Sequence, residues 1–236
     1  MISNWFNQTS DALLNVLLPP RCVNCGSSGS WLCRPCAARI DEISPPVCSK
    51  CGYPAGDSGA GCPECARNDL GGIDGIRSAA FFEGNPIHSA IVKFKYHNHK
   101  VMAAELALLL AKTYRQYSLN ADIIVPVPLH LSRWRERGYN QSELLARHLA
   151  RLLELPLDTA SLRRIRATRS QMTLGAVERY RNVAGAFQLA EQRQHKLADK
   201  TVLLVDDVWL SPYITGGQNT EDISVLKINN TEVFSF

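Results

Sequence analysis

Apolar residues along this chain follow two different periods, and each period predicts a different element. Residues 122–129 and 201–205 contain short apolar runs rich in β-branched side chains, which is the pattern of buried strands. Residues 140–155 instead place leucines at helical spacing, and Pro156 closes the segment. Strands that alternate with helices pair in parallel through helical crossovers. The sequence therefore predicts an α/β fold with a parallel sheet.

Weaker patterns predict the remaining elements. Residues 3–18 can line one side of a short helix, which either packs on the segment that follows or docks a partner. Residues 76–82 predict a strand, and residues 87–117 predict a long helical segment with a break near residues 96–100. The alternating apolar residues in 221–236 favour one further strand and no helix of adequate length.

All eight cysteines fall into four Cys-x-x-Cys pairs within residues 21–68, a segment rich in Gly, Ser and Pro that cannot bury much core. Two thiolates three residues apart can both bind one tetrahedral Zn²⁺, and two such pairs complete a Cys₄ site. The sequence therefore predicts two structural zinc ions. Their ligands are Cys22, Cys25, Cys33, Cys36, Cys48, Cys51, Cys62 and Cys65.

The order in which the four cysteine pairs combine is open at this stage. Sequential pairing closes the shortest loops, and an interleaved arrangement is also compatible with the spacing. A redox-active Cys-x-x-Cys is the alternative to zinc, but such motifs usually occur as a single pair beside a βαβ unit. Because four thiolates leave no free ligand position, these zinc ions are expected to be structural.

Composition and charge narrow the class of protein. The chain has 236 residues, of which 45% are hydrophobic and 20% charged, as in ordinary globular proteins. It lacks a secretory signal pattern and an apolar run of the roughly 18 residues that span a membrane. A reducing cytoplasm, where cysteines bind metal more often than they form disulfides, is the expected location.

Basic residues gather in one part of the chain, although the net charge is only +4. Residues 129–181 contain eleven Arg and five acidic residues. This excess predicts an anion-binding face, with solvated helix faces as the alternative for any single arginine.

Three segments carry the candidate chemistry of this face. Asp206 and Asp207 follow a buried strand, where paired carboxylates can accept hydrogen bonds from ribose hydroxyls or hold Mg²⁺ through water. A loop after Leu129 offers guanidinium groups and backbone N–H groups to a phosphate or pyrophosphate. Its candidate ligand-binding residues are Arg133, Arg135, Arg137, Gly138, Asn140 and Gln141. Residues 163–171 are basic and poorly periodic, which favours a mobile loop that closes over an anion.

Together these segments resemble the ComF family, which joins an N-terminal double zinc ribbon to a type I phosphoribosyltransferase domain. The cysteine pairs, Pro126-Val-Pro-Leu129, Arg137-Gly-Tyr-Asn-Gln141, residues 171–187 and Leu203-Leu-Val-Asp-Asp207 carry the resemblance. It implies an α/β fold with a parallel sheet of phosphoribosyltransferase type and a small zinc-ribbon module. The expected division is an N-terminal helix at 1–20, a double zinc ribbon at 21–68 and a phosphoribosyltransferase-like domain at 76–236.

The resemblance also implies a function. Asp206 and Asp207 would face the ribose of a phosphoribosyl pyrophosphate-like ligand, the loop after Leu129 would face pyrophosphate, and Mg²⁺ would accompany the ligand. A role in natural DNA uptake is implied, with single-stranded DNA and the competence helicase as partners.

The chain departs from that family at residue 209. The family has a Thr-Thr-Gly-type phosphate-binding turn directly after Asp-Asp-Val, whereas Trp209-Leu-Ser-Pro212 follows Val208 here. Loss of the turn removes donors that bind the 5′-phosphate, so a ligand-binding protein in DNA uptake ranks ahead of an active phosphoribosyltransferase in nucleotide metabolism. A zinc-ribbon interaction protein with an inactive α/β domain is the third hypothesis.

Overall fold

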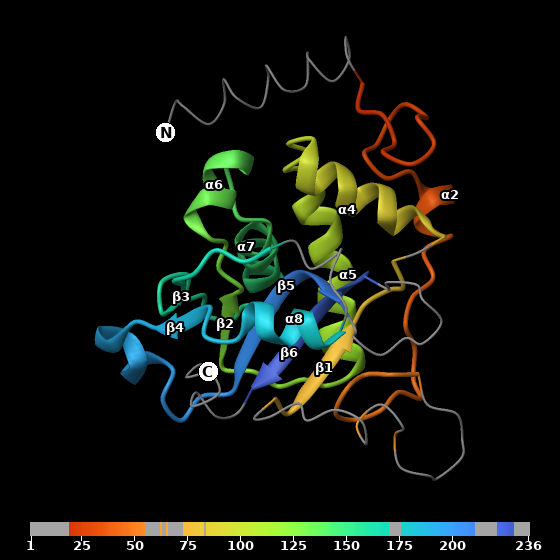
Figure 1. Ribbon diagram of the computed structural model, residues 1–236. Coiled ribbons are helices and arrows are strands. Elements are labelled where there is room, and N and C mark those ends of the chain that lie inside the picture. The colour runs from red at the N-terminus through yellow and green to blue at the C-terminus, as the bar shows by residue number, and fades with distance from the viewer. Residues whose placement is uncertain are drawn as a thin grey trace, which may run out of the picture.

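The computed structural model of the protein describes residues 19–54, 62, 65, 73–82, 84–169, 176–210 and 221–228. A sheet lies at the centre, with most helices on one side and the cysteine-rich segment at one end (Figure 1). The predicted helix over residues 3–18 lies outside the described residues.

The central sheet has the strand order β1-β6-β5-β2. Strand β2 (Ile123–Pro126) pairs in parallel with β5 (Val202–Leu210), which confirms the predicted α/β class with a parallel pair. Strand β6 (Glu221–Ile228) runs antiparallel both to β5 and to β1 (Gly75–Ser78). The strand predicted in the tail thus enters the sheet between β1 and β5, and β1 ends before the predicted residue 82.

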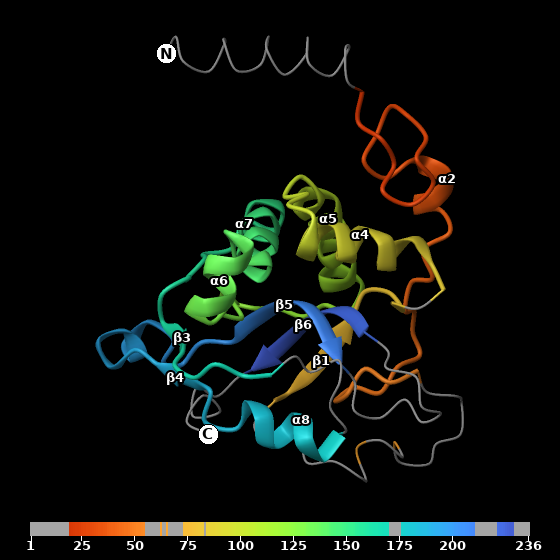
Figure 2. The ribbon, with the colours of Figure 1, turned by 45° about the horizontal axis from the view of Figure 1, so that its top comes forward.

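Three helices cover one face of this sheet, α4 (Pro86–Tyr96), α5 (Met102–Gln116) and α7 (Gln141–Leu153), as Figure 2 shows. The break predicted near residues 96–100 is confirmed, because α4 and α5 are separate helices. Leu106, Leu110, Leu145 and Leu149 are fully buried and pack with Leu203 of β5. These leucines anchor α5 and α7 to the sheet through the burial of apolar surface.

A second, smaller sheet joins β3 (Leu162–Arg164) and β4 (Phe187–Leu189), which are antiparallel. Leu162 and Leu189 pack against Val125 and Val202 of the main sheet. The prediction of a mobile loop from Arg163 is therefore wrong for Arg163 and Arg164, because Leu162 ties their strand to the core. Helix α8 (Ala176–Val183) lies on the opposite face from α4, α5 and α7 (Figure 2), and the 3₁₀ helix η2 (Glu191–Lys196) follows β4.

The cysteine-rich segment includes the short helix α2 (Arg34–Ala37) and contacts the α/β part through backbone hydrogen bonds. The Ile76 N–H donates to the Lys50 carbonyl (2.8 Å), and the Phe81 N–H donates to the Asp41 carbonyl (2.9 Å). These bonds hold the segment along β1 and the residues after it. Among the helices of the described ranges, none combines the length and apolar character that crossing a membrane requires.

Candidate functional site

The first cysteine group consists of Cys22, Cys25, Cys33 and Cys36, whose sulfur atoms all lie within 4.8 Å of one another. Cys25 Sγ and Cys33 Sγ are 3.6 Å apart. Four thiolates at tetrahedral Zn–S bonds of about 2.3 Å would place their sulfurs about 3.8 Å apart. The group therefore fits a structural zinc ion.

The second group consists of Cys48, Cys51, Cys62 and Cys65 and meets the same distance limit. Its Cys48–Cys65 and Cys51–Cys62 sulfur pairs are 3.6 and 3.5 Å apart. The two groups confirm sequential pairing of the Cys-x-x-Cys motifs and exclude the interleaved arrangement.

The thiols of the first group also show why a cation suits it. Burial raises the pKa of Cys22, but backbone hydrogen bonds outweigh burial and lower that pKa to about 6. The Asn24 side chain lowers the pKa of Cys36, yet burial and the neighbouring thiols raise it to about 12. Four sulfurs this close cannot all carry negative charge alone, and a bound Zn²⁺ would compensate them.

A second candidate site lies where β2 and β5 meet the N-terminus of α7. The Val127 N–H donates to the Val205 carbonyl (2.9 Å), and the Asn140 amide donates to the Val127 carbonyl (3.0 Å). The Ser142 N–H donates to Asn140 Oδ1 (3.2 Å), and the Ser142 hydroxyl donates to Asp206 Oδ1 (2.8 Å). Asp206 follows Val205 in the chain, so these four hydrogen bonds and the Val205–Asp206 peptide bond together form a closed ring. We call the ring, with Gln141, the α7–β5 site.

Gln141 lies between Asn140 and Ser142 in the chain and carries a buried donor. The residue is only 2% exposed, and its Nε2 atom has no hydrogen-bond partner among the described residues. A buried amide donor without a partner is costly. The first residues of α7 also lie at the positive end of the helix dipole. This arrangement suits an oxygen-rich, negatively charged ligand.

The prediction that the two acids lie at a strand end is wrong, because β5 continues to Leu210. Extension is possible because β6 pairs with β5 beyond them, with a register shift between Asp206 and Trp209. The parallel neighbour β2 nevertheless ends at Pro126, opposite Val205. Asp206 therefore still lies at the rim that β2 and β5 share. The side chain of Asp207 lies outside the described ones.

The predicted loop after Leu129 contains a helix, α6 (Leu131–Arg137). His130 caps its start, because the imidazole Nδ1 accepts from the Ser132 N–H (3.2 Å), and Gly138 ends it with a φ of 78°. Arginine and glutamate have high helix propensity, which favours a helix in this segment over a loop. Arg133, Arg135 and Arg137 are thus on a helix, and Arg135 is exposed.

Sequence reasoning also missed Ser142 and misplaced Arg164. The Arg164 guanidinium lies over the Phe187 ring, 5.1 Å from its centre, and its Nε has no partner among the described residues. Burial lowers the pKa of Arg164, the charge of Asp206 raises it, and Arg133 and Arg166 lower it. Arg164 therefore lies within electrostatic range of one acid, Asp206, and of two other arginines. Only the fold reveals this cluster, because its members are far apart in sequence.

Two four-cysteine groups with zinc-ribbon spacing beside an α/β domain define the class of this protein. Residues 13–66 match the double zinc ribbon domain family. The chain is 32% identical to competence protein F of Haemophilus influenzae over 217 residues, which cover 87% of this chain and 90% of the relative. It is 31% identical to the DNA utilization protein YhgH of Escherichia coli K12 over 210 residues, 86% of each chain. The protein belongs to the ComF family, competence protein F and its relatives.

Proposed function

We propose that this protein binds a phosphoribosyl pyrophosphate-like ligand at the α7–β5 site and uses that site in DNA uptake. The single observation that carries the proposal is the hydrogen-bonded ring that holds Asp206 beside the N-terminus of α7. A carboxylate fixed in this way can accept hydrogen bonds from two vicinal ribose hydroxyls. The neighbouring donors suit the phosphates of the same ligand.

The charges around the ring support a ligand that carries phosphate. The charges of Asp206 and Arg133 both act on Arg164, and the buried Gln141 amide is a neutral donor without a partner among the described residues. Arg166 instead donates to the Ala184 carbonyl (2.5 Å). In our proposal Arg133, Gly138 and Gln141 face the pyrophosphate, and Asp206 and Asp207 face the ribose. Asn140 acts by holding the ring together.

We further propose that Mg²⁺ enters together with the ligand. A magnesium ion in such a site is held mainly by ligand phosphates, with one or two carboxylates and water. Asp206 is the carboxylate among the described side chains of the α7–β5 site that could support it. The proposed zinc ions serve a separate purpose, the folding of the cysteine-rich segment.

Ligand binding is favoured over turnover by the path of β5. Strand β5 continues through Val208 to Leu210, at the point where the family pattern has its phosphate-binding turn. An active phosphoribosyltransferase in nucleotide metabolism would need donors for the 5′-phosphate from elsewhere. A zinc-ribbon interaction protein with an inactive α/β domain would need no ring around Asp206.

The role in DNA uptake rests on the relatives, which are named a competence protein and DNA utilization proteins. Single-stranded DNA and the competence helicase are the partners that we propose, acting in the cytoplasm. A ligand-controlled adaptor between these partners fits a site built for binding.

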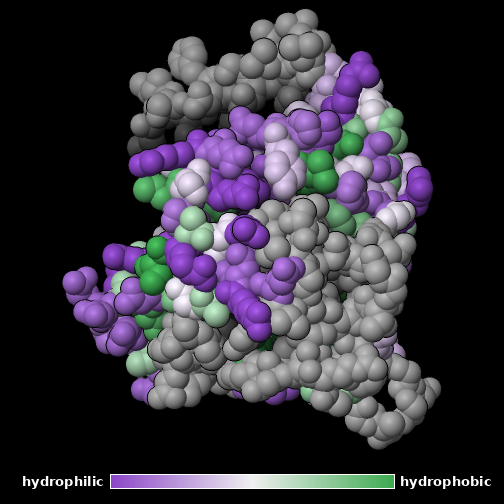
Figure 3. Space-filling model, viewed as in Figure 1, coloured by the Kyte–Doolittle hydropathy of each residue, from purple (hydrophilic) through white to green (hydrophobic). Residues whose placement is uncertain are grey.

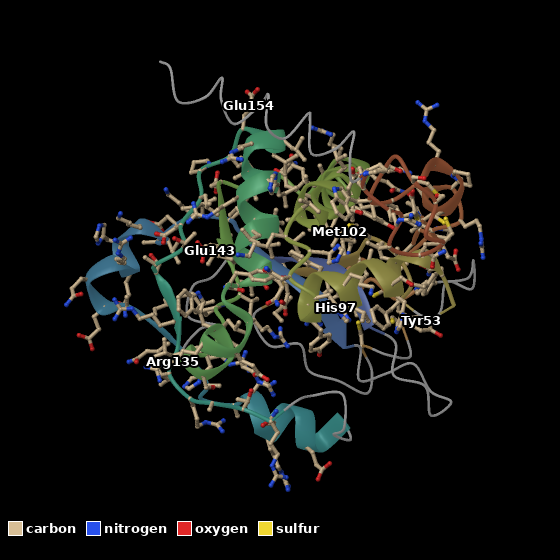
Figure 4. All side chains as sticks on the ribbon, turned by 90° about the horizontal axis from the view of Figure 1, so that it is seen from above. Tyr53, His97, Met102, Arg135, Glu143 and Glu154 are labelled. Atoms are coloured by element: carbon tan, nitrogen blue, oxygen red, sulfur yellow. The ribbon has the colours of Figure 1, made fainter. Side chains whose placement is uncertain are left out.

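Isothermal titration calorimetry with phosphoribosyl pyrophosphate and Mg²⁺ tests the ligand. We expect Asp206→Asn to abolish measurable binding and Ser142→Ala to weaken it by about tenfold, the effect of a lost hydrogen bond to a charged group. Glu154→Gln, at the far end of α7 (Figure 4), is the matched control and should bind as the unmodified protein does. Equal binding by Asp206→Asn and Glu154→Gln would refute the ligand site.

A further inference from the structure

Helix α6 presents apolar side chains to the outside that the fold itself does not use. None of its residues is buried, and Leu131 and Trp134 are 56% and 49% exposed. Tyr96, at the end of α4, is 55% exposed. The core therefore does not explain why two large aromatic rings occur on these neighbouring helices.

A cation–π contact joins the two helices. The Arg137 guanidinium lies over the Tyr96 ring, 5.2 Å from its centre. This contact places the exposed tyrosine next to α6, where Trp134 lies one turn before Arg137 and shares its side of the helix. Tyr96, Trp134 and Arg137, with Lys93 on α4, form what we call the α4–α6 surface.

Charge on both helices has one dominant sign. Residues 93–97 contain two lysines and no acid, and residues 131–137 contain three arginines and one acid. That acid, Glu136, lies 3.5 Å from Arg133, so part of its charge is already compensated. Figure 3 shows mainly hydrophilic residues over α4 and α6, with hydrophobic ones set among them. Cations interleaved with separate aromatic rings suit a polyanion that also carries flat rings.

We propose that the α4–α6 surface binds single-stranded nucleic acid, with bases stacked on Trp134 and Tyr96 and phosphates paired with Lys93 and Arg137. Stacking requires unpaired bases, because a duplex hides the faces of its bases. The isolated aromatic rings do not make the continuous apolar face that a lipid surface would need. This inference rests on the proposed role in DNA handling and adds the surface that makes the contact.

Fluorescence anisotropy of a labelled oligothymidylate with the full-length protein tests the surface. We expect Trp134→Ala and Tyr96→Ala each to weaken binding by about tenfold, the usual effect of losing one stacked base. Trp134→Phe should recover most of the affinity, because it keeps a ring. Both positions are about half exposed, so the variants should fold, and circular dichroism can confirm this.

Salt dependence separates the arginine from the rings. Arg137→Gln should weaken binding and lower the slope of log affinity against log salt by about one, whereas Trp134→Ala should leave the slope unchanged. Arg151→Gln is the matched control, because Arg151 is an exposed arginine in the last turn of α7, at the end away from the α7–β5 site. It should bind as the unmodified protein does.

The possible failures can be told apart. Oligothymidylate binding that survives Trp134→Ala and Tyr96→Ala overturns the surface and leaves the DNA role intact. Equal weakening of duplex and single-strand binding overturns the stacking. An unmodified protein that binds no oligonucleotide, or that binds an acidic peptide more tightly, overturns the nucleic-acid contact, while calorimetry with phosphoribosyl pyrophosphate still decides the ligand site.

Discussion

The conformation and environment of Arg164 in the structure differ from those that the sequence predicts. In the sequence it belongs to a basic run that resembles a mobile loop. In the structure it lies on β3, stacked on Phe187. Burial and two other arginines lower its pKa, and the charge of Asp206 offsets them only in part. A partly buried arginine among like charges is unfavourable unless an anion joins it. Arg164 is therefore a candidate ligand for a phosphate group at the α7–β5 site.

Replacing Arg164 tests this role against its neighbour in the same strand. We expect Arg164→Gln to weaken binding of inorganic pyrophosphate by about tenfold or more, because a charge-assisted hydrogen bond is lost. Arg163 is exposed and points to the opposite face of β3, so Arg163→Gln should have little effect. Calorimetry measures both, and equal losses would assign the effect to net charge alone.

At the scale of elements, the turn before β3 depends on a single carboxylate. Asp158 Oδ1 accepts from the Ala160 N–H (2.8 Å) and the Ser161 N–H (2.9 Å), and Oδ2 accepts from the Ser161 hydroxyl (2.7 Å). The Asp158 N–H donates to the Ile124 carbonyl (2.9 Å), which attaches the turn to β2. Burial raises the pKa of Asp158, but these hydrogen bonds and Arg193 lower it overall.

A lowered pKa makes this turn sensitive to acid. The stabilisation is present above the unfolded pKa of about 4 and is lost as the pH falls through the lower folded pKa. We expect Asp158→Asn to lower the free energy of unfolding by about 1–3 kcal/mol near neutral pH, and the difference should shrink toward about pH 3. Urea denaturation at both pH values measures it. Asp199→Asn, at an exposed residue, should be neutral.

The sequence predicted well those elements whose formation depends mainly on one requirement, the burial of apolar residues. The buried runs of β2 and β5 and the leucine-rich α7 follow directly from the need to bury apolar residues. Helix α6 and strand β3 were mispredicted because their many arginines suit several conformations, and a cap or a single leucine decides between them. The cysteine groups could be predicted because metal binding fixes their spacing, whereas the Ser142–Asp206 contact depends on residues 64 positions apart.

At the scale of the whole molecule, the second cysteine group is built onto the main sheet. Gly52 has a φ of +73°, and a Cβ atom on it would lie 2.5 Å from the Ile76 carbonyl oxygen of β1. Arg77 completes the contact by donating from Nη2 to the Ser49 carbonyl (2.8 Å). The second metal-binding group and strand β1 are therefore held together by a close backbone contact between Gly52 and Ile76 and by the hydrogen bond from Arg77 to Ser49.

A comparison of Gly26 with Gly52 distinguishes the cost of a left-handed backbone conformation from the cost of a steric clash with β1. Gly26 has a similar φ of +77°, but a Cβ atom there would meet nothing within 4 Å. Gly26→Ala should cost about 1–2 kcal/mol, the strain of a left-handed residue alone. Gly52→Ala should cost more, because the Ile76 carbonyl must move as well. Urea denaturation of the zinc-loaded proteins compares them, and equal losses would show that the contact with β1 can yield.

Loss of metal from the second cysteine group should destabilise strand β1 of the main sheet. The Ile76 N–H donates to the carbonyl of Lys50, which lies between Cys48 and Cys51. Because structural zinc folds the segment that binds it, Cys51→Ser should loosen this turn and release the Ile76 amide. We expect faster hydrogen exchange in residues 73–82 of Cys51→Ser. Cys25→Ser, which alters only the first group, should leave this peptide protected. If both variants exchange alike there, the two groups fold as one unit, and β1 depends on the whole double ribbon.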